Sequence, residues 1–320
     1  MTNSSPMRPM SAGNVVSAGF RLYSSHLKPY LSISVKATLW AMLPWVTLII
    51  LLTAAFVPLI LSQGQNFVSL ILLLLIFPWI GLAIYCGARS SLNSALIARL
   101  AYGELSGQPE DSRTALQQIR PRMWSFLLVH IAVGCVMFGI NFGLSIVQNL
   151  LIIGIPAIAL RDYPRVSGIF AVFVSLASLA IYFWFWAHFY IPEVAIAMEG
   201  DTNAFDMIGR SWNLSKGSAN RILIILAIAT LVTLPLYGLA AIPVVPTLIA
   251  TASLIQAQDA SAIGWFVLAC LAGILLFLLV GLFTLPFWQT LKAVVYYDLR
   301  TRREGVDLEF RNSTNDTPRN

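Results

Sequence analysis

The chain has 320 residues, of which 58% are hydrophobic and only 11% are charged. This leaves too little polar surface to cover a soluble domain of that size, so water is excluded as its main solvent. The formal net charge of +6 does not indicate a nucleic-acid partner, because the basic residues lie beside apolar runs rather than in one polar patch. We therefore expect an all-α fold, a polytopic membrane bundle of about six transmembrane helices.

The predicted elements follow from apolar runs that are long enough to cross a bilayer, which takes roughly 20 helical residues. No signal peptide is expected, because residues 1–30 are polar and the first apolar stretch, about Ala37–Leu61, is too long for a cleavable one. Residues 1–11 are expected to be disordered. Six spans are predicted, at about 33–61, 67–90, 124–152, 168–198, 220–255 and 262–297. With their connections they form one predicted membrane domain over 12–310, followed by a polar tail at 311–320 that is also expected to be disordered.

The fifth predicted span is the one whose form stays open. It contains Pro235, Pro243 and Pro246, and each proline removes a helical hydrogen bond and crowds the preceding turn. The span is therefore either one kinked helix or a helix that continues as a re-entrant or interfacial piece.

The distribution of Lys and Arg predicts the orientation of the chain. Eighteen of these 20 residues lie on one side of the predicted spans, in the N-terminal segment, the alternate connections, the C-terminal segment or the adjoining span ends, and only Arg161 and Arg165 lie on the opposite side. Such a bias places both termini and the two longer loops in the cytoplasm. The outward turns, near Gln63–Asn66 and Gln256–Ser261, are too short to hold a folded domain.

Each pair of spans is preceded by a short segment with apolar residues at helical spacing and basic residues on its other face. These segments are expected to lie along the cytoplasmic lipid surface as amphipathic helices. The even-numbered spans end at Glu104, Glu199 and Asp298, which indicates three degenerate repeats of an amphipathic helix and a hairpin. The candidate lipid-surface residues are Arg21, Lys28, Arg113, Arg120, Arg122, Arg210, Lys216 and Arg221.

Three ionisable residues fall inside the predicted spans, where charge is costly and often functional. His130 lies near the start of the third span, and His188 and Glu193 lie near the end of the fourth. An antiparallel pairing of these spans would bring them to similar depths, as a polar cluster that relays protons or binds a headgroup. The alternative is that each histidine hydrogen-bonds a neighbouring helix and Glu193 lies near the headgroups.

The chain shows none of the short motifs that carry catalysis. It has no phosphate-binding glycine loop, serine elbow, paired Cys-x-x-Cys or His-Glu-x-x-His. We therefore expect no catalytic residues, no cofactor, no metal site and no enzymatic activity.

Two segments, Ala204–Gly217 and Tyr296–Gly305, carry a resemblance to a known family. The chain is similar to bacterial integral membrane proteins grouped with the membrane domain of glycerophosphoryl diester phosphodiesterases, including YciC-like proteins, from about Gly13 to Glu309. The resemblance implies a six-helix membrane domain in a bacterial inner (plasma) membrane; phosphodiesterase activity is not expected, because no segment here forms the catalytic barrel that some relatives carry. The family-like residues are Arg210, Ser211, Trp212, Tyr297, Asp298, Leu299 and Arg300.

The function expected from these observations is that of a non-enzymatic scaffold or lipid-associated membrane protein. Its expected partners are membrane lipids, anionic ones included, with a protein partner or a second copy of the chain left open and nucleic acid excluded. The alternative is a small-solute or proton-coupled transporter or channel that uses His130, His188 and Glu193.

Overall fold

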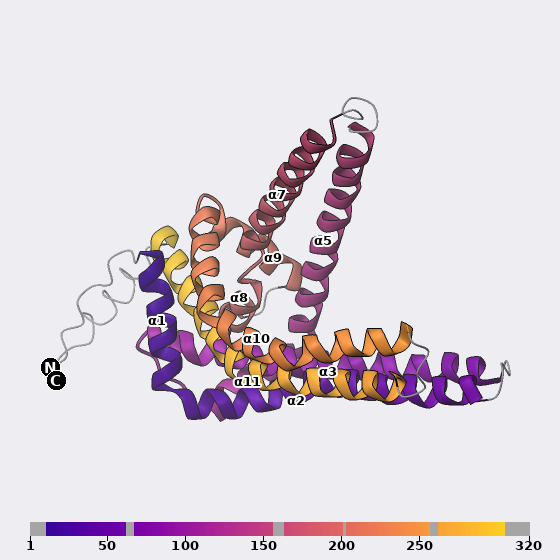
Figure 1. Cartoon of the computed structure of the whole chain (residues 1–320). Helices are drawn as coiled ribbons and strands as arrows, with labels where there is room; N and C mark the ends of the chain where they lie inside the picture. The colour runs from indigo at the N-terminus through magenta and orange to yellow at the C-terminus, as the bar shows by residue number, and fades with distance from the viewer. Residues whose placement is uncertain (1–10, 62–66, 156–162, 201–202, 257–261, 305–320) are drawn as a thin grey trace, which may run out of the picture. The chain divides into compact units, whose positions relative to one another are not determined.

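The computed structural model describes residues 11–61, 67–155, 163–200, 203–256 and 262–304, and every regular element in these ranges is a helix (Figure 1). The segments predicted to be disordered and the predicted outward turns lie outside the described residues, except for Ser11 and Gln256. The long helices are α2 (Leu27–Leu61), α3 (Phe67–Leu105), α5 (Met123–Asn149), α7 (Pro164–His188), α10 (Ala219–Gln256) and α11 (Ala262–Glu304). The short ones are α1 (Ala12–Ser25), α4 (Ser112–Ile119), α8 (Pro192–Glu199) and α9 (Ala204–Ser215), with a 3-10 turn over Arg120–Arg122 and a π turn over Leu150–Gly154 on either side of α5.

Six helical stretches of the described chain are long and apolar enough to cross a membrane. They are Leu27–Leu52, Leu74–Leu105, Ser112–Gly154, Arg165–Glu199, Ala219–Ser253 and Gly264–Glu304. The prediction of an all-α, polytopic membrane protein is confirmed.

The long helices present large apolar side chains on their outer surfaces. Phe138, Ile169, Phe173 and Leu231 are 73%, 72%, 69% and 67% exposed, respectively. Apolar surface on this scale is unfavourable in water but matches a lipid environment, where the helices satisfy their own backbone groups.

The chain forms two compact units. One contains Met1–Val15, Leu128–Leu226 and Val295–Asn320, and the other contains Val16–Leu127 and Ala227–Val294. We call them unit 1 and unit 2. The predicted single domain over 12–310 stays a prediction.

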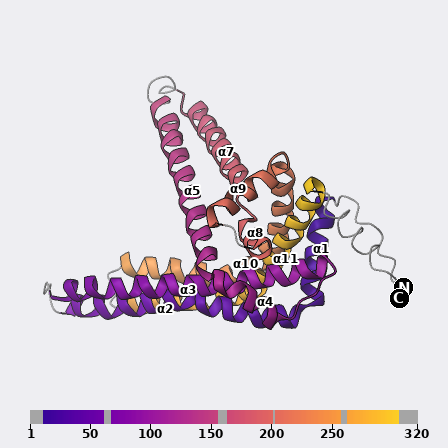
Figure 2. The same ribbon diagram turned by 180° about the vertical axis from the view of Figure 1, so that it is seen from behind.

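Unit 2 is built on two helical hairpins. α2 and α3 run side by side in both views (Figures 1 and 2), and the Trp79 Nε1–H of α3 donates to the Pro44 carbonyl of α2 at 2.9 Å. The second hairpin consists of α10 from Ala227 and α11 up to Val294, and Ser34 of α2 donates to its Leu282 carbonyl at 2.8 Å.

Unit 1 contains the hairpin of α5 and α7 (Figure 1) together with α8, α9, the start of α10 and the end of α11. The predicted fourth span, 168–198, covers two helices here, because α7 ends at His188 and α8 begins at Pro192. Proline has no N–H and its ring crowds the preceding turn, so the helix restarts with Pro192 in its first turn.

The fifth predicted span is a single helix in the structure. α10 runs from Ala219 to Gln256 with Pro235, Pro243 and Pro246 inside it. Of the two alternatives left open by the sequence, the continuous helix is the one observed.

Candidate functional site

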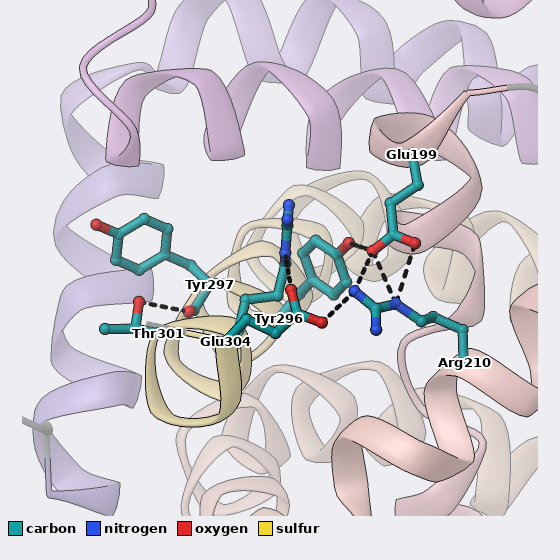
Figure 3. A network of polar contacts seen from close by, with 7 residues as sticks. Glu199, Arg210, Tyr296, Tyr297, Thr301 and Glu304 are labelled. Atoms are coloured by element: carbon teal, nitrogen blue, oxygen red, sulfur yellow. Dashed lines mark hydrogen bonds and ion pairs between the residues drawn. The ribbon is translucent and has the colours of Figure 1, made fainter. Parts of the chain in front are cut away.

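An ion-pair network in unit 1 joins the end of α8 to α9 and to the last turns of α11 (Figure 3). The Arg210 Nε–H lies 3.0 Å from both carboxylate oxygens of Glu199. Arg210 Nη2 also pairs with Glu304, whose other oxygen accepts from Arg300 Nε at 2.9 Å. The Tyr296 hydroxyl donates to Glu199. One guanidinium therefore binds carboxylates from two different helices.

The charge of Arg210 is fixed by this arrangement. Its side chain is 29% exposed, and those of Glu199 and Glu304 are 19% and 26% exposed. Burial acts to lower the pKa of the Arg210 guanidinium, but the hydrogen bonds and charges of Glu199 and Glu304 outweigh it and raise the pKa above its ordinary value.

A second carboxylate, Asp298, connects α11 to the start of α10. It is 5% exposed, and Arg221 Nη1 and Nη2 lie 2.6 and 3.2 Å from its two oxygens. Arg302 Nε lies 3.1 Å from the same side chain, one helical turn further along α11. The contact of Arg221 with Asp298 is bidentate, because the planar guanidinium meets both oxygens of the planar carboxylate.

The break between α7 and α8 is covered by Ser211 of α9. In an uninterrupted helix the N–H of residue 192 would donate to the His188 carbonyl, but Pro192 has no N–H. The Ser211 hydroxyl takes its place at 2.7 Å, and both residues are buried. A buried carbonyl without a donor would be costly, so this contact stabilises the docking of α9.

The His188 ring is enclosed by the same face of α9. Its Nδ1 lies 2.7 Å from the Ser215 hydroxyl, and its centroid lies 4.1 Å from that of Trp212 and 4.5 Å from that of Trp184. The Ser215 hydroxyl oxygen also lies 2.8 Å from the Ser211 carbonyl and 3.1 Å from the Trp212 carbonyl. When that hydroxyl donates to one of these carbonyls, its oxygen accepts from the Nδ1–H tautomer of His188.

Of the three residues predicted as an intramembrane cluster, His130 and Glu193 are brought together. His130 Nε2 lies 2.9 Å from Glu193 Oε2, between α5 and α8. The carboxylate is buried, with 3% of the side chain exposed, whereas the His130 side chain is 43% exposed. His188 instead takes Ser215 and the two tryptophans as its contacts.

The predicted lipid-surface residues divide into two groups. Arg21, Lys28, Arg113, Arg120 and Lys216 are exposed, on or beside the short helices, and Arg122 is half-buried. Arg210 and Arg221, in contrast, are the arginines of the two ion-pair networks.

The residues that carry the resemblance to the membrane-domain family each make a specific contact or are buried. Arg210 ties α9 to Glu199 and Glu304, Ser211 bonds the His188 carbonyl, and Trp212 packs on the His188 ring. On α11, Asp298 binds Arg221 and Arg302, Arg300 binds Glu304, Leu299 is buried, and the Tyr297 carbonyl accepts from the Thr301 hydroxyl at 2.9 Å.

Tyr296 and Glu304 are site residues that were not predicted from the sequence, and Glu199 was predicted only as the end of a span. The available signal was the acidic residue that closes each even-numbered span. In unit 2 the corresponding Glu104 lies 3.4 Å from His26, and in unit 1 Glu199 and Asp298 each bind an arginine. All three span ends therefore carry a carboxylate that faces a basic side chain.

The described residues hold no group of three or more His, Cys, Asp or Glu side chains placed to bind a metal ion. Comparison with protein-family models, curated proteins and solved structures finds no match to this chain. The resemblance to the glycerophosphoryl diester phosphodiesterase membrane-domain family remains a prediction.

Proposed function

We propose that this chain is a non-enzymatic, lipid-associated membrane protein that uses exposed basic residues on its short helices to bind an anionic membrane surface. Bacterial inner-membrane localisation, cytoplasmic termini and membership of the family named above belong to the same proposal. The observation that supports it is that nearly every described carboxylate already has a basic or backbone partner, whereas a set of basic side chains remains exposed.

Most of the described carboxylates contact a partner within their own unit. In unit 2, Glu104 faces His26, Glu110 binds Arg99 at 2.9 Å, and Asp111 accepts from the first turn of α4. In unit 1, Glu193, Glu199, Asp298 and Glu304 all lie in contact with His or Arg. Asp206 is the exposed acidic residue that remains in the described chain.

The exposed basic residues lie on or beside short helices that also carry apolar side chains. Arg113 belongs to α4, whose Ala115 and Ile119 are buried on the opposite face, and Arg120 follows directly. Lys216 follows α9, which also exposes 69% of Phe205. Each such Lys or Arg near an anionic surface contributes about 1 kcal/mol, and apolar side chains beside them are typical of interfacial helices.

The test measures how much phosphatidylglycerol stays bound to the full-length protein when it is taken from mixed vesicles of phosphatidylcholine and phosphatidylglycerol. The variant carries Arg113→Gln with Arg120→Gln, and the control carries Arg161→Gln with Arg165→Gln, which removes the same charge from the predicted outer side. We expect the first variant to retain phosphatidylglycerol about tenfold more weakly and the control to match the wild type. Equal retention by both variants would contradict the proposal.

A second candidate function is favoured by the contact of His130 with Glu193. A buried carboxylate beside a partly exposed imidazole is a common arrangement in proton-coupled transporters. Proton flux into vesicles, followed with a trapped pH-sensitive dye, would then be lost in Glu193→Gln and kept in His26→Asn. Absence of wild-type flux above that of protein-free vesicles would exclude a proton pathway.

A further inference from the structure

Arg89 of α3 lies against two aromatic side chains in unit 2, whose rings also contact each other. Its guanidinium carbon lies 5.4 Å from the centroid of the Trp40 ring and 5.7 Å from that of Tyr85. The two rings meet edge to face, with centroids 5.7 Å apart. Both cation–π contacts orient the guanidinium, but neither neutralises its charge.

Among the described residues, no acidic side chain pairs with Arg89, and its Nε is buried without a hydrogen-bond partner. Arg99, further along the same helix, is different: Glu110 and Gln118 both accept from its guanidinium. Arginine stays charged at all relevant pH values. Arg89 is therefore a cation without a carboxylate partner among the described residues, and its buried Nε–H has no acceptor.

The predicted second span, 67–90, places Arg89 at headgroup depth, near the cytoplasmic end of that span. The helices α2 and α3 contain 35 and 39 residues, whereas the hydrocarbon core takes only about 20. Counting about 20 residues back from Leu61 and forward from Phe67 reaches the levels of Met42 and Cys86. Trp40 and Arg89 lie just beyond these levels, where aromatic rings and cations meet lipid phosphates.

Exposed apolar side chains lie close to the aromatic pair. Tyr85 is 39% exposed, and Leu39 and Leu43, which are one and three residues from Trp40 along α2, are 62% and 40% exposed, so acyl chains have apolar surface to contact here. Lys36 is exposed and lies one helical turn before Trp40, on the same face of α2. A second cation is thus available on the side of Trp40 that faces water.

We infer that Arg89, Trp40, Tyr85 and Lys36 form a binding site for the phosphate diester of an anionic phospholipid. Arginine's planar fork binds phosphate oxygens in pairs, and the two rings keep that fork at one depth. This site goes beyond the proposed function, because it predicts one ordered lipid rather than general attraction by the exposed basic residues. It does not depend on Arg113, Arg120 or Lys216.

The experiment is native mass spectrometry of the full-length protein in neutral detergent, titrated in separate arms with phosphatidylglycerol, phosphatidylcholine and inorganic phosphate. For the wild type we expect one tightly bound phosphatidylglycerol, weaker phosphatidylcholine and no comparable binding of inorganic phosphate. Arg89→Gln should weaken phosphatidylglycerol binding about tenfold or more. Arg89→Lys, which keeps the charge but loses the fork, should fall between the two.

Two controls separate this site from folding and from the surface residues. Arg165→Gln removes an exposed arginine from another helix, and Arg113→Gln with Arg120→Gln tests the exposed basic residues; both should keep the tightly bound lipid. A monodisperse Arg89→Lys variant shows that the hairpin is intact. Unchanged phosphatidylglycerol affinity in Arg89→Gln, or equal affinity for inorganic phosphate, would overturn the inference while leaving the lipid-surface proposal standing.

Discussion

The Ser211 hydroxyl donates to the His188 carbonyl, the one that Pro192 leaves without its helical donor. The break between α7 and α8 and the docking of α9 are therefore parts of a single arrangement. A polar contact of this kind has a large effect on stability only when its acceptor is buried, as this one is.

Replacing Ser211 should therefore destabilise unit 1. We expect Ser211→Ala to lower the free energy of unfolding by about 1–3 kcal/mol, because the His188 carbonyl loses its donor at 2.7 Å and keeps only the Ser215 hydroxyl at 3.5 Å. Titration with a denaturing detergent, followed by circular dichroism, measures the change. Ser24→Ala is the matched control: its hydroxyl donates within the exposed turn of α1, to the Arg21 carbonyl, so a change within about 0.5 kcal/mol is expected.

A Pro192→Ala variant tests whether Ser211 stabilises the protein by replacing the missing N–H of Pro192. Alanine restores an N–H at residue 192, which can donate to the His188 carbonyl and close the helix. In this background Ser211→Ala should lower the free energy of unfolding by less than it does in the wild type. The same cost in both backgrounds would show that Ser211 acts by packing alone.

The Arg210 network makes a prediction about coupling. Glu199→Gln and Arg210→Gln should each lower the free energy of unfolding by about 1–3 kcal/mol, and their double variant should cost less than the sum by more than about 0.5 kcal/mol. Arg210→Lys should not restore stability, because one ammonium group cannot reach Glu199 and Glu304 as the guanidinium does. Additive costs in the cycle would mean that the two side chains act independently.

Gly103 is predicted to be intolerant of a side chain. A Cβ at this position would lie 2.8 Å from the Gln108 carbonyl oxygen, a backbone atom that cannot move aside easily. Gly103→Ala should destabilise by about 1–3 kcal/mol. Gly81→Ala, in the same helix with no atom within 4 Å of the new Cβ, should be neutral or stabilising. Thermal unfolding in detergent compares the two, and equal midpoints would refute the predicted clash.

The orientation of the chain is tested by cysteine labelling. In a background with Cys86, Cys135 and Cys270 replaced by serine, Ser313→Cys should react only after cells are permeabilised. Gln65→Cys should react in intact cells with a membrane-impermeant maleimide. The expectation rests on the excess of Lys and Arg on one side of the predicted spans, and the opposite labelling pattern would reverse the topology.

The fold class could be predicted from sequence because run length and composition alone determine whether a helix suits a bilayer. The contacts of α9 could not. Helical spacing in the sequence predicts an apolar face of Phe205, Ile208 and Trp212 for α9. In the structure the buried residues include Ala204, Met207, Ser211 and Leu214, and Phe205 is exposed. Ser211 lies on the buried face, where its hydroxyl donates to the His188 carbonyl. Hydrophobic periodicity gives no signal for a polar contact of this kind.

The candidate site shows the same limit. Arg210 and Arg221 were predicted as surface cations because one lies in a short amphipathic segment and the other lies at the start of a predicted span. Their carboxylate partners lie 11 and 77 residues away. Long-range ion pairs leave no periodic signal. The meeting of His130 with Glu193 could be predicted, because antiparallel packing of two spans relates depth to sequence position.

The shared carboxylate of Glu199 implies an order of assembly. Arg210 follows Glu199 by 11 residues, so their pair becomes available as soon as α9 has been synthesised. Tyr296, whose hydroxyl binds the same carboxylate, follows Glu199 by 97 residues. Because chains emerge N-terminus first, α9 can pair with α8 during translation. The contact with Tyr296 forms only after the last helix has been synthesised.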